Sequence, residues 1–167
     1  MLENTILQAG KPIETDFQPD VVQAYRILIV DDEPLICRLN REALTEAGYE
    51  VDEAENGMAA WNKLQSRGYD LLITDHLMPE MTGVELLLRL HASHRSLPTI
   101  MISGTMPNEE LERYPWLEIQ ARLDKPHDIT GLGETVGTIL RATAAARGQM
   151  ELMPYMQTQP ADAALRV

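Results

Sequence analysis

Five short apolar runs, each followed by a segment with helical periodicity, succeed one another from Arg26 onward. RILIVD, which opens the series, is rich in branched residues and apolar along nearly its whole length, as in strands that are covered on both faces. Such strands, alternating with helices, form one parallel sheet with right-handed crossovers and helices on both faces. We therefore expect an α/β fold with five parallel strands, at residues 26–31, 49–54, 70–75, 99–103 and 118–124.

Helical periodicity marks the segments between these strands. Pro34 near the start and Gly48 after the end delimit the first helix, and a second helix is expected over 56–65. A short fourth helix over 108–114 stops before Pro115. The apolar stripes of the first, third and last helices predict as buried side chains Leu35, Ile36, Leu39 and Ala43, then Val84, Leu87, Leu88 and His91, then Ile129, Leu132, Val136, Ile139 and Leu140.

The two ends of the chain lack a sustained period. Residues 1–25 mix Gly, Pro, Gln and acidic residues, and we expect a mostly flexible extension there. Residues 148–167 are largely polar and interrupted by prolines, which favours a disordered tail, with a docking segment for a partner as the alternative. One domain is therefore expected over residues 26–147, a length that fits a single core.

Charge and composition exclude several classes of protein. The 26 acidic against 14 basic residues give a net charge of -12, which repels the phosphates of nucleic acid. No run approaches the roughly 20 apolar residues of a membrane span, and the N-terminus lacks the pattern of a secretory signal. Cys37 is the single cysteine, so no intrachain disulfide can form. We expect a protein of the reducing cytoplasm that binds neither nucleic acid nor membranes.

Acidic residues follow two of the predicted strands. Asp31 and Asp32 end the first strand, and Asp75 ends the third. The carboxyl ends of parallel strands meet at one edge of the sheet, so three like charges gather there and favour a bound cation. Oxygen ligands favour Mg2+, which often shares its site with phosphate oxygens. Ser103 and Lys125 end the fourth and fifth strands, so the predicted pocket also offers a hydroxyl and an ammonium to a phosphoryl group.

Four motifs stand in order at these strand ends: RILIVDDEP, LLITDHLMPEMTG, MISG and LDKP. In them the chain resembles the receiver domains of response regulators in two-component signalling, and most of all single-domain, CheY-like receivers. The resemblance implies a doubly wound, flavodoxin-like fold and Mg2+ as cofactor. It also implies a sensor histidine kinase or a histidine phosphotransfer protein as phosphoryl donor, and a downstream protein target.

The resemblance assigns a role to each residue of the acidic site. Asp75 is the phosphoacceptor, and Ser103 and Lys125 bind the phosphoryl group, with inward movement of Ser103 as the switch. The metal ligands that it implies are the carboxylates of Asp32 (direct), Asp31 (through water) and Asp75, and the backbone carbonyl of Leu77. The peptide bond between Lys125 and Pro126 is expected to be cis, since X-Pro bonds adopt that form at modest cost.

The chain departs from the receiver pattern at Arg122, where an aromatic residue usually reports phosphorylation. We expect Arg122 either to stay exposed and make charge-dependent contacts or to leave the output to another route. Trp116, in an unusual segment after a short acidic helix, is expected to plug the core. His76 should point away from Asp75 by strand alternation.

The predicted function is that of a stand-alone receiver that is phosphorylated on Asp75, because the residues after Arg147 are too few for a helix-turn-helix domain. It would catalyse only its own Mg2+-dependent phosphorylation and dephosphorylation, and its changed surface would bind a partner or a second copy. A phosphorelay intermediate and a scaffold that acts without phosphorylation are the alternatives. A haloacid-dehalogenase-like hydrolase fits less well, since it needs a second aspartate where Glu33 follows Asp31.

Overall fold

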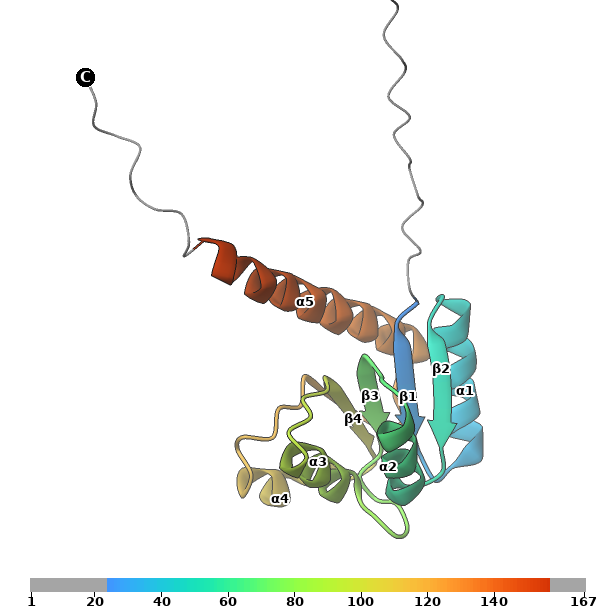
Figure 1. The fold of residues 1–167 in the computed structure, drawn as a ribbon. Helices are drawn as coiled ribbons and strands as arrows, with labels where there is room; N and C mark the ends of the chain where they lie inside the picture. The colour runs from blue at the N-terminus through green and yellow to red at the C-terminus, as the bar shows by residue number, and fades with distance from the viewer. Residues whose placement is uncertain (1–23, 157–167) are drawn as a thin grey trace, which may run out of the picture.

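The computed structural model describes residues 24–156 and has one five-stranded parallel sheet (Figure 1). The strand order is β2-β1-β3-β4-β5, so the chain moves outward from β1 in both directions, as in a doubly wound sheet. This is the predicted fold class. The strands are β1 Arg26–Val30, β2 Glu50–Ala54, β3 Leu71–Thr74, β4 Thr99–Ser103 and β5 Ala121–Asp124.

A helix follows each strand, and the helices lie on both faces of the sheet (Figure 1). Asn56 caps α2 by accepting a hydrogen bond from the backbone N–H of Ala59, and Thr82 and Glu85 form a capping box at the start of α3. The fourth helix is shorter than predicted and ends at Glu112. The helices are α1 Pro34–Glu46, α2 Gly57–Ser66, α3 Gly83–Ala92, α4 Asn108–Glu112 and α5 Ile129–Met156.

Successive residues of each strand pack into two separate hydrophobic cores, one on each face of the sheet, because side chains alternate between the faces. In β1, Ile27 and Ile29 pack with α1 and α5, whereas Leu28 and Val30 pack with α2 and α3. Leu111 of α4 belongs to the second of these cores. The two apolar layers cover both faces of the sheet, and Asp31, Asp75 and Lys125 directly follow β1, β3 and β5 at its carboxyl edge.

Five predicted burials are wrong, including that of Ile129, which is 37% exposed at the start of α5. Leu35 is 65% exposed and Leu39 is 39% exposed, because α1 turns a neighbouring stripe of Cys37, Asn40 and Leu44 to the sheet. This leaves apolar side chains of α1 in solvent.

The side chain of His91 is exposed as well, because Leu90 occupies the buried stripe of α3. Trp116 does not plug the core: it is 45% exposed and packs against His91, with ring centroids 4.1 Å apart and ring planes tilted by 38°. The segment between α4 and β5 therefore places Trp116 on the end of α3, while Tyr114, Leu117 and Ile119 pack against the core that contains Leu111.

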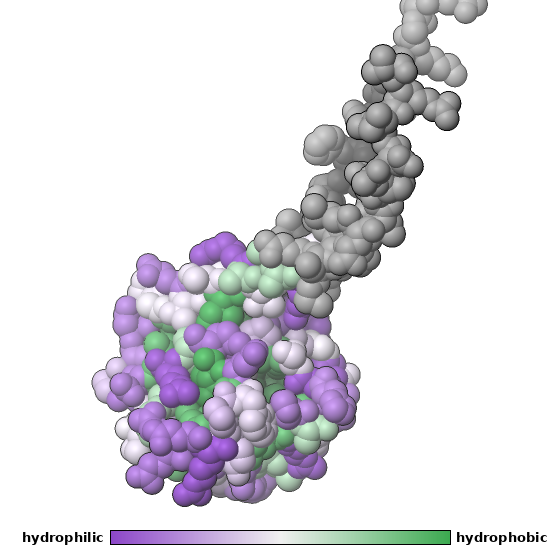
Figure 2. All heavy atoms as spheres, turned by 90° about the vertical axis from the view of Figure 1, so that its left-hand side faces the viewer, coloured by the Kyte–Doolittle hydropathy of each residue, from purple (hydrophilic) through white to green (hydrophobic). Residues whose placement is uncertain are grey.

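The side of the molecule that carries α4 shows hydrophobic atoms gathered in the middle of the face, with hydrophilic residues around them (Figure 2). The short α4 buries only Leu111, and the edge strand β5 alternates half-buried and exposed residues. Part of the apolar surface on this side is therefore open to solvent.

The last helix extends beyond the domain boundary that we placed at Arg147 and runs to Met156, away from the sheet (Figure 1). The other predicted extension, and the tail after Met156, lie almost entirely outside the described residues. Among the residues that the structure describes, none of the helices has the length and apolar character to cross a membrane.

Candidate functional site

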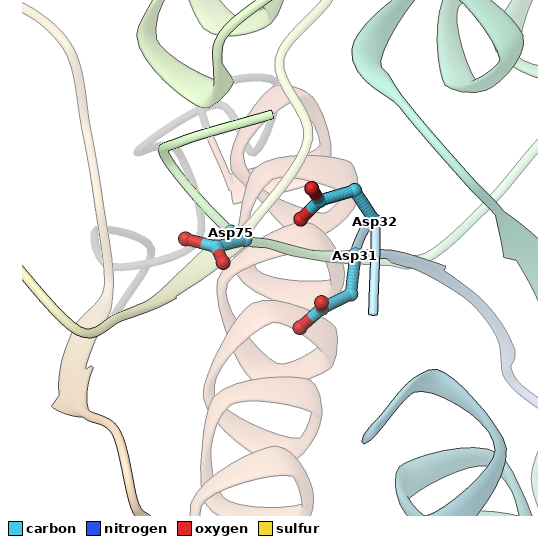
Figure 3. A group of neighbouring side chains, drawn as sticks. All are labelled: Asp31, Asp32 and Asp75. Atoms are coloured by element: carbon cyan, nitrogen blue, oxygen red, sulfur yellow. The ribbon is translucent and has the colours of Figure 1, made fainter. Parts of the chain in front are cut away.

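Three carboxylates meet at the carboxyl edge of the sheet (Figure 3). The register pairs Val30 of β1 with Thr74 of β3, and Asp31 and Asp75 are the next residues of these adjacent strands. The backbone N–H of Asp75 donates to the carbonyl of Val30 at 2.9 Å, which holds the two strand ends together. One oxygen from each of Asp31, Asp32 and Asp75 lies within 4.8 Å of the others.

These carboxylates differ in their exposure. Asp31 and Asp75 are buried, with 5% and 7% of their surface exposed, whereas Asp32 lies open to solvent. Oxygen donors close together, with one of them facing water, match Mg2+, which binds a few carboxylates and keeps several of its own waters. The residues present therefore fit a magnesium ion at this edge.

The ammonium of Lys125 reaches into the acidic cluster from the end of β5. Its Nζ lies 2.6 Å from Oδ2 of Asp75, 2.8 Å from Oδ2 of Asp31 and 3.2 Å from Oε1 of Glu33. The predicted cis bond between Lys125 and Pro126 is present. Sequence reasoning missed Glu33, although it directly follows the aspartate pair in the DDEP motif.

Burial and charge act in opposite directions at this cluster. Burial raises the pKa of Asp31 above its usual value, and the hydrogen bond from Lys125 only partly offsets this. Burial also disfavours the charged form of Lys125, but its hydrogen bonds to Asp31 and Asp75 outweigh the loss of water and raise its pKa. The site thus combines the buried Asp31 and Asp75 with the exposed Asp32 and Glu33, and its carboxylates outnumber the ammonium of Lys125.

The backbone around Asp75 fixes its carboxylate. Its Oδ1 accepts hydrogen bonds from the N–H groups of His76 at 2.5 Å and Leu77 at 3.3 Å, while Oδ2 faces Lys125. The loop then turns back so closely that a Cβ atom on Gly83 would clash with the carbonyl oxygen of Asp75. Glycine is therefore required at this position for the loop to close on the site.

The other predicted residues lie around this centre. Ser103 is buried at the end of β4, where its hydroxyl donates to the carbonyl of Thr105 at 3.1 Å rather than to Asp75. Leu77 is exposed beside Asp75, as expected of a residue that offers only its backbone. Arg122 is exposed on β5, and its charge-dependent contacts stay a prediction.

The side chain of His76 is 7% exposed and reaches α4, where its Nε2 lies 3.6 Å from Oε2 of Glu110. Strand alternation predicted that it would point away from Asp75, and its side-chain partner is on the fourth helix. Its Nδ1 is buried without a hydrogen-bond partner. The residue next to Asp75 thus contacts α4 directly, a link that the sequence did not indicate.

Comparison with known proteins shows which family shares the sequence of this domain. Residues 27–136 match the family model of the response regulator receiver domain. The regulatory protein VanRB of Enterococcus faecalis is 33% identical over 134 residues, which are 77% of this chain and 60% of that protein. The transcriptional regulatory protein CusR of Escherichia coli is 32% identical over 122 residues, or 72% of this chain and 53% of CusR.

The sensor protein EvgS of Escherichia coli is 41% identical over 87 residues, which are 52% of this chain and 7% of EvgS. The chain therefore spans less than two thirds of the length of each of these curated relatives. The likeness therefore concerns only part of each relative.

Solved structures agree with the sequence relatives. A CheY-like receiver domain from Methanospirillum hungatei is 28% identical and superposes with a TM-score of 0.69, covering 74% of this chain and 98% of its own. The response regulator TrrA of Thermotoga maritima, solved in complex with Mg2+ and BeF, is 34% identical with a TM-score of 0.61, covering 69% and 98% of the two chains. With its flavodoxin-like sheet and its acidic site, this chain belongs to the response regulator receiver domain family.

Proposed function

We propose that Asp75 of this domain accepts a phosphoryl group from a histidine of a donor protein, either a sensor kinase or a phosphotransfer protein. The observation that supports it most is the contact of the Asp75 carboxylate with Lys125, in a cluster that Asp31 and Asp32 complete. One carboxylate oxygen is held by backbone N–H groups and the other faces an ammonium, so the nucleophile is oriented before a donor arrives.

In this proposal a carboxylate oxygen of Asp75 attacks the phosphorus atom of the phosphohistidine. An O–P bond forms, the P–N bond breaks, and its electron pair stays on the imidazole nitrogen of the donor. Lys125 binds a transferred oxygen and offsets its charge. Hydrolysis of the resulting acyl phosphate returns the domain to its starting state.

Asp32 would bind Mg2+ directly, Asp31 through a water, and Asp75 and the carbonyl of Leu77 would complete the protein's ligands. Bound there, the ion supplies positive charge for the equatorial phosphoryl oxygens.

The donor would approach over α1, beside the acidic site. The mispredicted side chains Leu35 and Leu39 are exposed there, and Ile129 at the start of α5 is 37% exposed. Leu39 and Ile129 line a groove that also includes Glu33 and Lys125. A groove that exposes apolar side chains and reaches Lys125, the contact of Asp75, fits a protein donor, whose apolar side chains would be buried on contact.

Phosphorylation would be read on the side of α4 and β5. Ser103, now bound to the backbone of Thr105, would turn to a phosphoryl oxygen and draw the loop after β4 inward. The open apolar surface near α4, together with the exposed Arg122, would then bind a partner protein or a second copy with altered affinity (Figure 2).

The purified protein should gain the mass of one phosphoryl group when incubated with acetyl phosphate and Mg2+. Asp75→Asn should abolish this gain, and removal of Mg2+ with a chelator should strongly reduce it. Asp124→Asn is the matched control, because it removes an exposed aspartate that also ends a strand. Equal phosphoryl uptake by Asp75→Asn and the unmodified protein would refute the proposal.

A further inference from the structure

A buried polar contact joins α1 to the loop that follows Lys125. Asn40 lies on the sheet side of α1 and is 2% exposed, and its Oδ1 is 2.9 Å from Nε2 of His127. His127 is half-buried and follows the lysine by two residues. An asparagine side chain so deeply buried needs a hydrogen-bond partner, and His127 supplies it.

The two segments that this contact joins carry opposite charges of the acidic site. The helix α1 begins at Pro34, directly after the segment of Asp31 and Glu33, whereas His127 stands on the same loop as Lys125. Asn40, His127, Glu33 and Lys125 also line one groove. The contact between Asn40 and His127 therefore lies where it can set the distance between the Lys125 ammonium and the carboxylates of the acidic site.

We propose that Asn40 and His127 form a positioning pair that holds the loop after β5 against α1 and so keeps the Lys125 ammonium on Asp31 and Asp75. Neither residue is catalytic, since the side chains of Asn40 and His127 contact one another and not the reacting carboxylate of Asp75. The positioning of Lys125 does not depend on the proposed phosphoacceptor function. Only its expected consequence, faster phosphorylation of Asp75 when Lys125 is in place, rests on that function.

The geometry explains why the backbone that carries Lys125 needs a second point of attachment. Lys125 has a long, flexible side chain, and it must reach carboxylates that follow two other strands, Asp31 and Glu33 after β1 and Asp75 after β3. The strand β5 is short and at the edge of the sheet, paired only with β4. The pairing of β5 with β4 constrains the backbone of Lys125 only before the residue. His127, two residues later and held by Asn40, constrains it from the other side.

Burial lowers the pKa of His127, and the nearby Lys125 acts in the same direction. The imidazole is therefore neutral near neutral pH, and in the tautomer that pairs them its Nε2–H donates to Asn40. A neutral ring beside the loop adds no charge that would compete with the ammonium for Asp31.

Competitive labelling of lysine amines with acetic anhydride tests the position of Lys125 without any phosphorylation. In the intact protein Lys125 should react more slowly than Lys63 of α2, which serves as the internal reference. Asn40→Leu should raise the relative labelling rate of Lys125 about tenfold, the scale set by the loss of one net hydrogen bond. His127→Phe should do the same, and the double variant should add little more.

Two controls separate positioning from general loss of stability. Asn40→Asp keeps the acceptor oxygen and should retain slow labelling of Lys125. Leu44→Val weakens the core under the same helix, where Leu44 is 1% exposed, and should lower the melting temperature without changing the labelling ratio. If Asn40→Leu does not fold, His127→Phe carries the test, because His127 is only half-buried.

Phosphorylation is measured in the same variants with acetyl phosphate. Faster labelling of Lys125 with slower phosphoryl uptake is the expected result, and unchanged labelling in both Asn40→Leu and His127→Phe would overturn the inference. Faster labelling in a protein that is never phosphorylated would leave the positioning pair intact and refute the proposed function instead.

Discussion

Removing the Lys125 ammonium is expected to destabilise the domain strongly in the absence of Mg2+. Lys125→Met leaves Asp31 and Asp75 close together without the cation that now contacts both, and their side chains are only 5% and 8% exposed. Breaking a buried ion pair costs about 3 to 5 kcal/mol. Because a carboxyl can take up a proton and Lys125 keeps 15% of its side chain exposed, we expect the lower end, about 3 kcal/mol.

A loss of about 3 kcal/mol lowers the melting temperature of a domain of this size by roughly 10 °C. Thermal unfolding followed by circular dichroism measures it, with Arg67→Met as control. Arg67 pairs with Asp52 at 2.7 Å on the surface, so its loss should cost less than about 1 kcal/mol.

Saturating Mg2+ should recover much of the deficit of Lys125→Met, because the ion neutralises the same carboxylates. A melting temperature for Lys125→Met as high as that of Arg67→Met would refute the reasoning. So would a deficit that Mg2+ leaves unchanged, since it would mean that the lost stability does not come from the acidic cluster.

Three further outcomes follow from single residues. Gly83→Ala should disturb the loop at Asp75 and cost about 1 to 3 kcal/mol in urea unfolding, because its Cβ would meet the Asp75 carbonyl; an unchanged midpoint would contradict the close approach. The pKa of His127 lies below the ordinary 6.5, so its contribution to stability is present above 6.5 and is lost as pH falls toward the folded pKa. Unfolding from about pH 7.5 to about 5.5 should show this loss, and His127→Gln should flatten it. Burial raises the pKa of Cys37 to about 12, so its thiol should react with a disulfide reagent only after unfolding; rapid reaction in the folded protein would show that α1 opens.

The sheet and its acidic edge were predictable because the signal is local. A nearly continuous apolar run is recognisable in the sequence as a buried parallel strand, and the residue that ends such a strand lies at the ligand-binding edge of the sheet. Asp31, Asp75 and Lys125 were therefore assigned to one site although they come from distant parts of the chain. The resemblance to receivers added the roles that geometry alone does not assign.

Side-chain partners between distant segments were not predictable. Two overlapping rows of side chains on α1 could face the sheet. The more polar row, which contains Asn40, is the buried one, and Asn40 is hydrogen-bonded there to His127, 87 residues further along the chain. Leu35 and Leu39 then lie in solvent against their hydropathy. Trp116 is a similar case, since it lies in the segment between α4 and β5 and its partner His91 stands on α3. Periodicity describes one helix at a time and does not include what a neighbouring segment brings to it.

The position of the phosphoryl group tests the central claim most directly. The protein is phosphorylated with acetyl phosphate and Mg2+, treated with borohydride, which reduces an aspartyl phosphate to homoserine, and digested for peptide sequencing by mass spectrometry. We predict homoserine at position 75 alone, with Asp31 and Asp32 unmodified. Homoserine at either of those two aspartates, or phosphoryl uptake without conversion at position 75, would contradict the account.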